Sequence, residues 1–239
     1  MIDYDRIALE YSRHRQVHPE VLRSLIAIGR IETTSKVLEV GCGTGNHVIA
    51  LEVSVGCSCW GIDASPRMLA KARERSRGVT FRLGRAEQLD FPSASFDLVF
   101  SVDVVHHLAD RRQHLREAYR VLRPGGKACT VTDSEWIIRH REPLAVYFPE
   151  TVEIELARYP CIGGLRGVME EAGFAEITDN RVEFPYELTD IQPYRDKAFS
   201  SLHLIAEEAF ERGMQRLERD LRSGPIPCVS RYVLLWGAK

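Results

Sequence analysis

The stretch VLEVGCGTGNHVIAL, residues 37–51, contains the turn that decides the fold. An apolar run typical of a buried strand stops at three glycines in alternate positions, Gly41, Gly43 and Gly45, and a second apolar pattern follows them. Because glycine is entropically costly in ordered structure, this junction indicates either a tight turn without a ligand or a backbone that a ligand approaches closely. The spacing predicts a strand before the glycines and a helix over residues 45–54.

Outward from this loop, apolar strand-like runs alternate with helical patterns. Strands are expected at residues 36–41, 57–63, 79–84, 96–103 and 127–133, and helices at residues 45–54, 65–76 and 110–122. The alternation loosens after residue 133, where we expect helices at 163–174 and about 191–222, and strands at 175–184 and 230–239. Strand and helix in alternation build a parallel sheet, which binds ligands beyond the carboxyl ends of its strands.

These elements predict an α/β fold with a doubly wound, mostly parallel, seven-stranded sheet, helices on both faces and a helical lid. We expect a single domain over residues 1–239. Its core sheet is expected in residues 36–135, 163–185 and 227–239, and its lid in residues 1–35, 136–162 and 186–226.

The composition excludes several classes of protein. Lys and Arg (32) nearly balance Asp and Glu (34), so a net charge of −2 provides no basic field for nucleic acid. No apolar run reaches the roughly 18 residues of a membrane-spanning helix, and the charged N-terminus is unlike a signal peptide. Six scattered cysteines indicate no zinc site, so we expect no metal and a reducing, cytoplasmic location.

Two acidic residues follow the strands next to the glycine loop. Asp63 ends the strand at 57–63, about 20 residues after the glycines, a position suited to binding ribose hydroxyls. The alternative for Asp63 is complementation of the next helix's N-terminal charge. Glu87 follows the strand at 79–84 and is placed to accept a hydrogen bond from an adenine amino group.

Several motifs together resemble the class I S-adenosylmethionine-dependent methyltransferases. They are VLEVGCGTG, the acid Asp63, RAEQLDFPSASFDLVFSVDVVHHL and VLRPGG, and they cover about residues 36–133. The resemblance is strongest to the small-molecule branch that includes the quinone-biosynthesis, or type 11, methyltransferases. It implies a Rossmann-like sheet and methyl transfer from S-adenosylmethionine to an O, N or C atom of a small acceptor, with S-adenosylhomocysteine as product.

The resemblance also implies which residues bind the cofactor. The glycine loop would face the methionine half, Asp63 the ribose, and Glu87 the adenine edge. Arg15 would pair with the cofactor's carboxylate, although a solvated helix face explains this residue equally well. The full implied set is Tyr11, Arg15, Glu39, Gly41, Cys42, Gly43, Gly45, Asp63, Ala64, Met68, Ala86, Glu87, Ser101 and Val102.

A catalytic base is needed only where the acceptor must lose a proton, because the sulfonium is already a strong electrophile. The candidates are His106 and His107, since histidine titrates near neutrality; the alternative is a structural hydrogen-bonding role. Asp103 lies in the same stretch as the two histidines, near the expected methyl position, and Asp133 and Glu135, after the fifth strand, are the next candidates.

The expected partner is a small-molecule acceptor, with no nucleic acid and no membrane span, and the protein is expected to be a monomer or homodimer. Aromatic residues of the lid segments could wall a pocket for the acceptor or form the core of the lid. Two other functions remain open: a non-catalytic S-adenosylmethionine-binding sensor or partner module, and a nicotinamide-dependent oxidoreductase. The glycine spacing disfavours the oxidoreductase, because a dehydrogenase would carry G-x-G-x-x-G.

Overall fold

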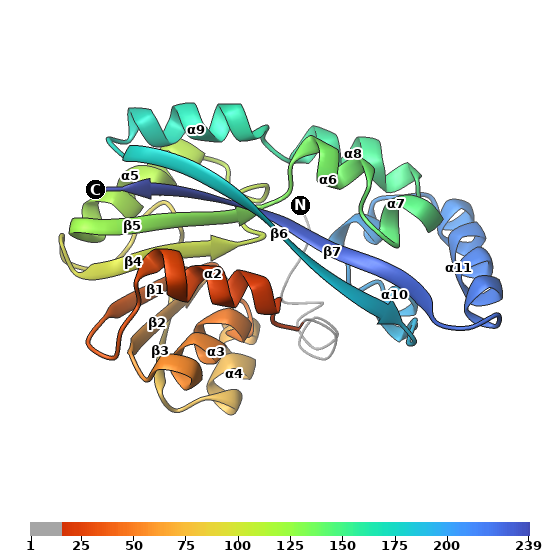
Figure 1. Ribbon diagram of the computed structural model, residues 1–239, viewed down its shortest axis with the longest axis horizontal. Helices are drawn as coiled ribbons and strands as arrows, with labels where there is room; N and C mark the ends of the chain where they lie inside the picture. Colours follow the sequence, from red (N-terminus) through yellow and green to blue (C-terminus); the bar gives the residue numbers. More distant parts are fainter. Residues whose placement is uncertain (1–15) are drawn as a thin grey trace.

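The computed structural model describes residues 16–239. In this part of the chain one seven-stranded sheet has the order β3-β2-β1-β4-β5-β7-β6 (Figure 1). The five strands from β3 to β5 are parallel, and β7 runs antiparallel to both β5 and β6. The strands are β1 (Lys36–Val40), β2 (Ser58–Asp63), β3 (Val79–Leu83), β4 (Phe96–Val102), β5 (Leu122–Thr132), β6 (Ala175–Leu188) and β7 (Ile226–Ala238). The expected doubly wound, mostly parallel sheet is confirmed.

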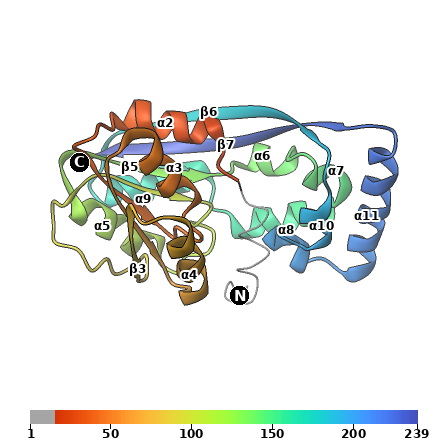
Figure 2. The same cartoon turned by 90° about the horizontal axis from the view of Figure 1, so that it is seen from below.

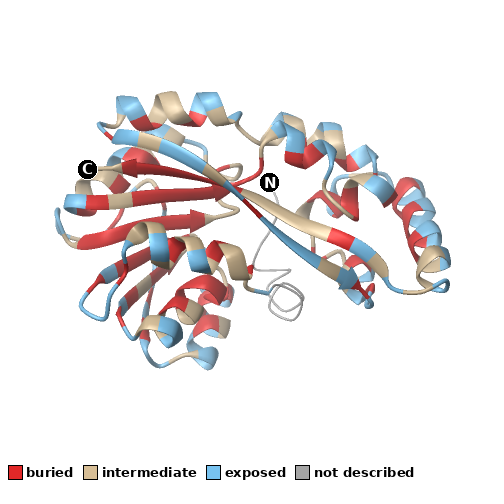
Figure 3. Ribbon diagram, viewed as in Figure 1, coloured by how far each residue is buried: buried red, intermediate tan, exposed pale blue. Residues whose placement is uncertain are grey.

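Helices cover both faces of this sheet. One face carries α2 (Pro19–Gly29), α3 (Asn46–Val55) and α4 (Pro66–Arg75), and the other carries α5 (Arg111–Val121) and α9 (Ile162–Glu171). Successive strand residues point to opposite faces, so Val37 packs with the first group and Leu38 with the second. The central strands are therefore apolar on both sides, and Figure 3 shows them almost wholly buried.

The helices begin and end where the local chemistry favours it. Ser65 caps α4 by accepting a hydrogen bond from the Met68 N–H at 3.1 Å, and Pro66 occupies the first turn. Gly45 and Gly56 flank α3 in the left-handed conformation, which only glycine adopts without strain. These residues fix the start of α3 and α4 close to the carboxyl ends of β1 and β2.

The remaining helices form a separate layer beyond the carboxyl ends of the parallel strands (Figures 1 and 2). We call residues 134–159 and 189–225 the helical extension. It has its own apolar cluster, in which Phe148, Leu202 and Leu217 are fully buried. Its elements are α6 (Glu135–Arg139), α7 (Leu144–Tyr147), α8 (Glu150–Arg158), α10 (Gln192–Arg195), the 3₁₀ turn η1 (Ser200–His203) and α11 (Glu207–Leu221).

The structure differs from the expected division into core and lid in two places. Residues 1–35 were assigned to the lid, but α2 packs on the sheet and buries Val21 and Leu25 completely in its core. Residues 186–188 and 226 were also assigned to the lid, but they belong to β6 and β7, which continue as a hairpin into the helical extension. The hairpin extends this far because its distal residues Leu188 and Cys228 are buried in the extension's own apolar cluster.

The helix expected over about 191–222 is broken into α10, η1 and α11. Lys197 has φ = 48°, in the left-handed region, and therefore ends the first helical segment. Ala206 is extended and starts α11 afresh. The three short segments can each place side chains in the apolar cluster of the helical extension, whereas one straight helix over the same residues could not surround it. None of the helices in residues 16–239 is long and apolar enough to cross a membrane.

Candidate active site

The glycine loop joins β1 to α3 with three residues in the left-handed region. Gly41, Gly43 and Gly45 have φ values of 70°, 52° and 78°. A Cβ atom on Gly41 would lie 2.5 Å from Cγ2 of Val104, and one on Gly45 would lie 2.9 Å from the Phe81 ring. The sequence therefore places glycine where both the backbone angles and the surrounding atoms exclude a side chain.

Asp63, at the end of β2, fixes the shape of this loop. One carboxylate oxygen accepts a hydrogen bond from the Gly43 N–H at 2.8 Å, and the other accepts one from the Ser65 N–H at 2.8 Å. A carboxylate has about four lone-pair positions, so Asp63 can accept further donors beyond these two. The side chain is half-buried at the carboxyl end of β2, next to β1, where the strand order reverses and ligands of such sheets bind.

Glu39, inside β1, anchors the other side of the loop. Its side chain is only 3% exposed and accepts a hydrogen bond from the Val48 N–H, in the first turn of α3, at 3.0 Å. Burial raises the pKa of Glu39 well above its ordinary value, although the hydrogen bond from Val48 opposes this. Arg75 ties α4 to the same loop by donating to the Thr44 carbonyl oxygen at 2.9 Å. The loop is thus held by β1, β2 and α4 together.

Two cavities meet at the carboxyl ends of the strands. A small cavity of about 40 Å³ lies beside the glycine loop, and a larger one of about 120 Å³ lies between the strand ends and the helical extension. Asp103 and Tyr232 line both of them. The Tyr232 hydroxyl donates a hydrogen bond to Asp103 at 2.8 Å. Asp103 has φ = 56°, a backbone conformation that is uncommon outside glycine and is found at functional sites.

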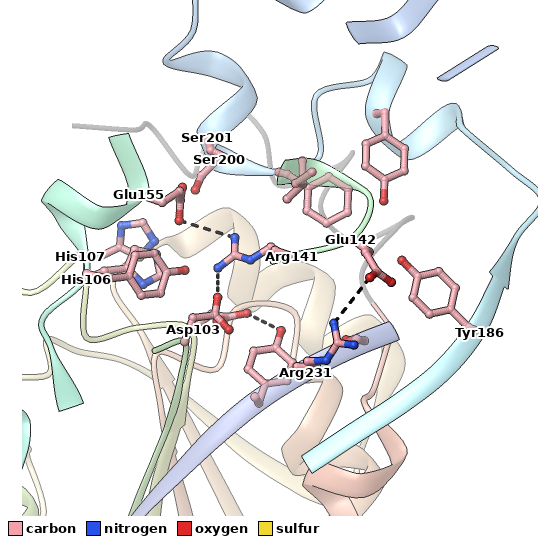
Figure 4. Close-up of a pocket in the computed structure, with 17 residues that line it drawn as sticks. Asp103, His106, His107, Arg141, Glu142, Glu155, Tyr186, Ser200, Ser201 and Arg231 are labelled. Atoms are coloured by element: carbon pink, nitrogen blue, oxygen red, sulfur yellow. Dashed lines mark hydrogen bonds and ion pairs between the residues drawn. The ribbon is translucent and has the colours of Figure 1, made fainter. Parts of the chain in front are cut away.

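Arg141 lies at the centre of the larger cavity's wall (Figure 4). It forms ion pairs with Asp133, which follows β5, and with Glu155 of α8, the latter at 3.6 Å. Burial lowers the pKa of Arg141, but the nearby groups of Tyr159, Glu155 and Asp103 outweigh it, and the pKa is raised. The guanidinium therefore remains a cation although it is buried. These ion pairs join the strand ends to the helical extension.

His106 and His107 line the larger cavity, as their position after β4 predicts. The His106 ring stacks on Tyr159 with ring centres 3.9 Å apart and an angle of 16°, and it also contacts the His107 ring at 3.9 Å. Burial raises the pKa of Tyr159 well above its ordinary value, so the phenol stays protonated. The stacking holds both histidines beside Asp103 and facing the cavity (Figure 4).

The structure brings together some of the predicted residues and separates others. Glu39, Gly41, Cys42 and Val102 line the small cavity. The other described members of the predicted cofactor set line neither cavity, and the side chain of Met68 is 1% exposed. They are Gly43, Gly45, Asp63, Ala64, Met68, Ala86, Glu87 and Ser101. Tyr11 and Arg15 lie outside the described residues.

Among the further candidate bases, Asp103 and Asp133 line the larger cavity, but Glu135 does not. Glu135 is exposed in the first turn of α6, so its expected place in the cleft is wrong. The chain turns into α6 directly after Asp133 because Ser134 caps this helix by accepting a hydrogen bond from the Ile137 N–H. That turn directs Glu135 to solvent.

Sequence reasoning missed much of the larger cavity's polar wall. Arg141, Glu142, Glu155 and Arg231 carry no recognisable motif, and they come from three segments far apart in the chain. The small cavity likewise contains four unpredicted side chains. These are His18, Asn46, His47 and Tyr232, and a fifth unpredicted residue, Gln16, lines it as well. A weak signal existed only for Asn46 and His47, which directly follow the last glycine of the loop.

Residues 38–130 match the family described as "Methyltransferase domain". The matched segment contains the glycine loop and Asp103, which border the small cavity, and also Asp63 and Glu87, which line neither cavity. Over residues 38–130 the chain therefore matches a methyltransferase domain, as the motifs predict.

The chain is similar in sequence to enzymes named for quinones. It is 33% identical over 155 residues to the demethylmenaquinone methyltransferase of Anoxybacillus flavithermus, covering 61% of this chain and 64% of that protein. It is 36% identical over 124 residues to 2-methyl-6-phytyl-1,4-hydroquinone methyltransferase 2 of Oryza sativa subsp. japonica, covering 49% of this chain and 36% of that protein. The chain thus spans less than two thirds of the length of these curated relatives.

Solved structures share the fold. A protein described as a methyltransferase from an antibiotic biosynthesis pathway of Anabaena variabilis matches with a TM-score of 0.72 and 20% identity, covering 96% of this chain and all of that one. Phosphoethanolamine N-methyltransferase 2 of Haemonchus contortus, solved in complex with S-adenosyl-L-methionine, matches with a TM-score of 0.65 and 20% identity, covering 98% and 57%. At these identities the likeness establishes the fold.

The residues around the small cavity fit the cofactor of the methyltransferases that residues 38–130 resemble. Gly41 lines the cavity without a side chain, so a ligand can lie directly against the backbone there. The Asp63 carboxylate lies beside the loop, where it accepts hydrogen bonds from the Gly43 and Ser65 N–H groups, and it can accept further hydrogen bonds from hydroxyl groups. Residues 16–239 contain no cluster of three or more His, Cys, Asp or Glu side chains that could hold a metal ion.

Proposed function

We propose that the protein transfers the methyl group of S-adenosylmethionine to an O, N or C atom of a small molecule. The smaller cavity would hold the methionine end of the cofactor, and the larger cavity the acceptor. The observation that carries this proposal is the shared wall formed by Asp103 and Tyr232. Direct transfer requires donor and acceptor to meet in line, and two cavities that touch at one point are suited to it.

The residue roles follow from the positions around the loop. Asp63 would accept hydrogen bonds from the ribose hydroxyls while its bonds to Gly43 and Ser65 keep it oriented. Glu39 and the backbone of Gly41 and Cys42 would form the floor beneath the methionine. The adenine contacts of Ala64, Met68, Ala86, Glu87 and the placements of Ser101 and Val102 remain proposals from the family resemblance.

Bound S-adenosylmethionine supplies an electrophilic methyl group on a sulfonium. The chain's own residues would then position the acceptor, exclude water and hold a proton. Asp103 is the best-placed proton acceptor, because it borders both cavities and is oriented by the Tyr232 hydroxyl. His106 stacks on Tyr159, and His107 contacts His106. These two histidines are the alternative proton acceptors if the methyl acceptor binds deeper in the larger cavity.

The acceptor proposed here is a small molecule and not a nucleic acid, since the net charge is −2 and the larger cavity is only about 120 Å³. The assembly proposed here is a monomer or a homodimer.

Calorimetric titration of the full chain with S-adenosylmethionine, S-adenosylhomocysteine and NADH tests the cofactor assignment. We expect micromolar binding of the two sulfur compounds and no binding of NADH. In Asp63→Ala we expect at least tenfold weaker binding, because the loop loses its anchor and the ribose its acceptor. The matched control is Asp110→Ala, which removes a helix-capping aspartate away from both cavities. Binding of NADH alone, or equal losses in the two variants, would refute the assignment.

A further inference from the structure

The larger cavity has an excess of negative groups. Four carboxylates line it, from Asp103, Asp133, Glu142 and Glu155, against two guanidinium groups, from Arg141 and Arg231. Both guanidinium groups are already shared between two acids. Arg141 pairs with Asp133 and Glu155, and Arg231 lies 3.9 Å from Glu142 and 3.3 Å from Glu183. An anionic ligand would therefore compete with these carboxylates for the two cations, whereas a cationic ligand meets more carboxylates than guanidinium groups in the cavity wall.

One carboxylate oxygen in this wall lacks a donor. Asp133 is 3% exposed, and its Oδ2 atom pairs with Arg141. Its Oδ1 atom is buried and accepts no hydrogen bond from any of the described residues. A buried acceptor without a donor costs about 1–3 kcal/mol, and more when it is charged. A ligand that brings N–H donors into the cavity would satisfy this oxygen.

The same cavity is rich in aromatic rings. Tyr159, Tyr186, Tyr194, Phe199 and Tyr232 all line it. The electron-rich faces of such rings attract cations, and Arg141 already lies over the Tyr159 ring at 5.6 Å. Carboxylates and aromatic rings in one cavity form an environment that favours an organic ammonium over a neutral or anionic group.

The volume of the cavity limits the size of its ligand. A cavity of about 120 Å³ is slightly smaller than the roughly 150 Å³ that is known to accept benzene. The portion of the acceptor that enters it is therefore small, of the order of a short alkyl chain or one ring. A long isoprenoid tail, such as that of a prenylated quinone, would have to lie outside this cavity.

We infer that the acceptor is a small amine, bound as an ammonium ion by Asp103, Asp133 and the aromatic rings of the larger cavity. The inference rests on the proposed methyltransferase function and specifies its substrate class. The ammonium would lose one proton to Asp103 and thence to water. Its nitrogen lone pair would form the new C–N bond while the C–S bond breaks and leaves its electron pair on sulfur. The products are a methylated ammonium, S-adenosylhomocysteine and one released proton.

Binding to the full chain without cofactor tests this inference directly. The probes are n-butylamine, butyrate and 1-butanol, which share one carbon skeleton and differ in charge, and saturation-transfer NMR measures their affinities. We expect n-butylamine to bind at least tenfold more tightly than butyrate or 1-butanol. Asp133→Asn should weaken amine binding about fivefold or more, and so should Glu142→Gln, which leaves the Asp133–Arg141 pair intact. The control Glu150→Gln changes an exposed acid outside the cavity and should have no effect.

Tighter binding of butyrate would overturn the inference, because it would show that the two arginines dominate the cavity. Equal binding of all three probes, or no binding of the amine, would overturn it as well. A second measurement, the release of S-adenosylhomocysteine with amine, phenol and carboxylate acceptors, distinguishes failure of the amine inference from failure of the proposed function. Turnover with phenols or carboxylates alone would refute the amine acceptor and leave methyl transfer standing. Failure of the protein to bind S-adenosylmethionine would refute methyl transfer itself.

Discussion

Gly41→Ala probes the closest backbone approach in the glycine loop. Alanine at this position must adopt φ = 70°, which costs about 1–2 kcal/mol for a residue with a Cβ atom. Its Cβ would also lie 2.5 Å from Cγ2 and 3.1 Å from Cγ1 of Val104. Overpacking of this kind adds about 1–3 kcal/mol. We therefore expect Gly41→Ala to lower the free energy of unfolding by about 2–5 kcal/mol.

Gly56→Ala is a matched control, because the chain offers a second glycine with nearly the same backbone. Gly56 ends α3 with φ = 74°, but a Cβ atom there would have no other atom within 4 Å. Only the backbone cost of about 1–2 kcal/mol then applies. The difference between the two variants isolates the steric contact with Val104, worth about 1–3 kcal/mol.

The assay is urea unfolding followed by circular dichroism, with the calorimetric affinity for S-adenosylmethionine as a second measurement. A repaired double variant, Gly41→Ala with Val104→Ala, removes both clashing atoms and leaves the nearest Val104 atom 3.4 Å away. We expect the double variant to recover at least about 1 kcal/mol relative to additivity. If Gly41→Ala is no more destabilising than Gly56→Ala, or if the Val104 change gives no recovery, the packing argument is wrong.

Three further predictions follow from individual contacts. Gly167→Ala in α9 places the new Cβ with no atom within 4 Å, so it should stabilise the fold by about 0.5–1 kcal/mol in the same urea assay. Gly213→Ala in α11 places the new Cβ 2.6 Å from the Tyr147 carbonyl oxygen, so it should destabilise the fold by about 1–3 kcal/mol. Burial lowers the pKa of His18 below its ordinary value of about 6.5. Stability that is present above that pH should therefore be lost as the pH falls and the unfolded chain binds the proton more readily. His18→Asn retains a side chain that can cap α2 and should flatten this part of the profile of stability against pH. An unchanged profile in His18→Asn would contradict the role of His18. Tyr232→Phe removes the hydroxyl that donates to Asp103 at 2.8 Å. It should lower the rate of S-adenosylhomocysteine release about tenfold and lower the free energy of unfolding by less than about 1.5 kcal/mol. Equal rates in the variant and the unmodified protein would show that Tyr232 does not position Asp103.

The cofactor side of the site is encoded in short segments that the sequence makes visible. Three glycines follow a buried strand, and the structure gives all three positive φ values. Asp63 ends the next strand, and parallel pairing of β1 with β2 places its carboxylate beside the glycine loop. These positions depend on local chemistry and on the regular geometry of a parallel sheet, so pattern and spacing suffice to predict them.

The acceptor side was decided by tertiary packing. The bond from Tyr232 to Asp103 joins residues 129 positions apart, and no periodicity in the chain indicates that they meet. Arg141 is polar and lies between short helices, so by sequence it is an ordinary surface residue, yet the helical extension buries it between Asp133 and Glu155. Likewise α2 packs on the sheet because its apolar side chains are buried against one face of the sheet.

The sequence by itself therefore determined the order of strands and helices, the glycine loop, its acidic partner Asp63 and the resemblance of this segment to a methyltransferase domain. The tertiary structure alone decided which charged and aromatic side chains surround the acceptor cavity. The physical reason is that backbone conformation follows from neighbouring residues, whereas the charge balance of a cavity depends on side chains that β4, β7 and the helical extension bring together from distant parts of the chain.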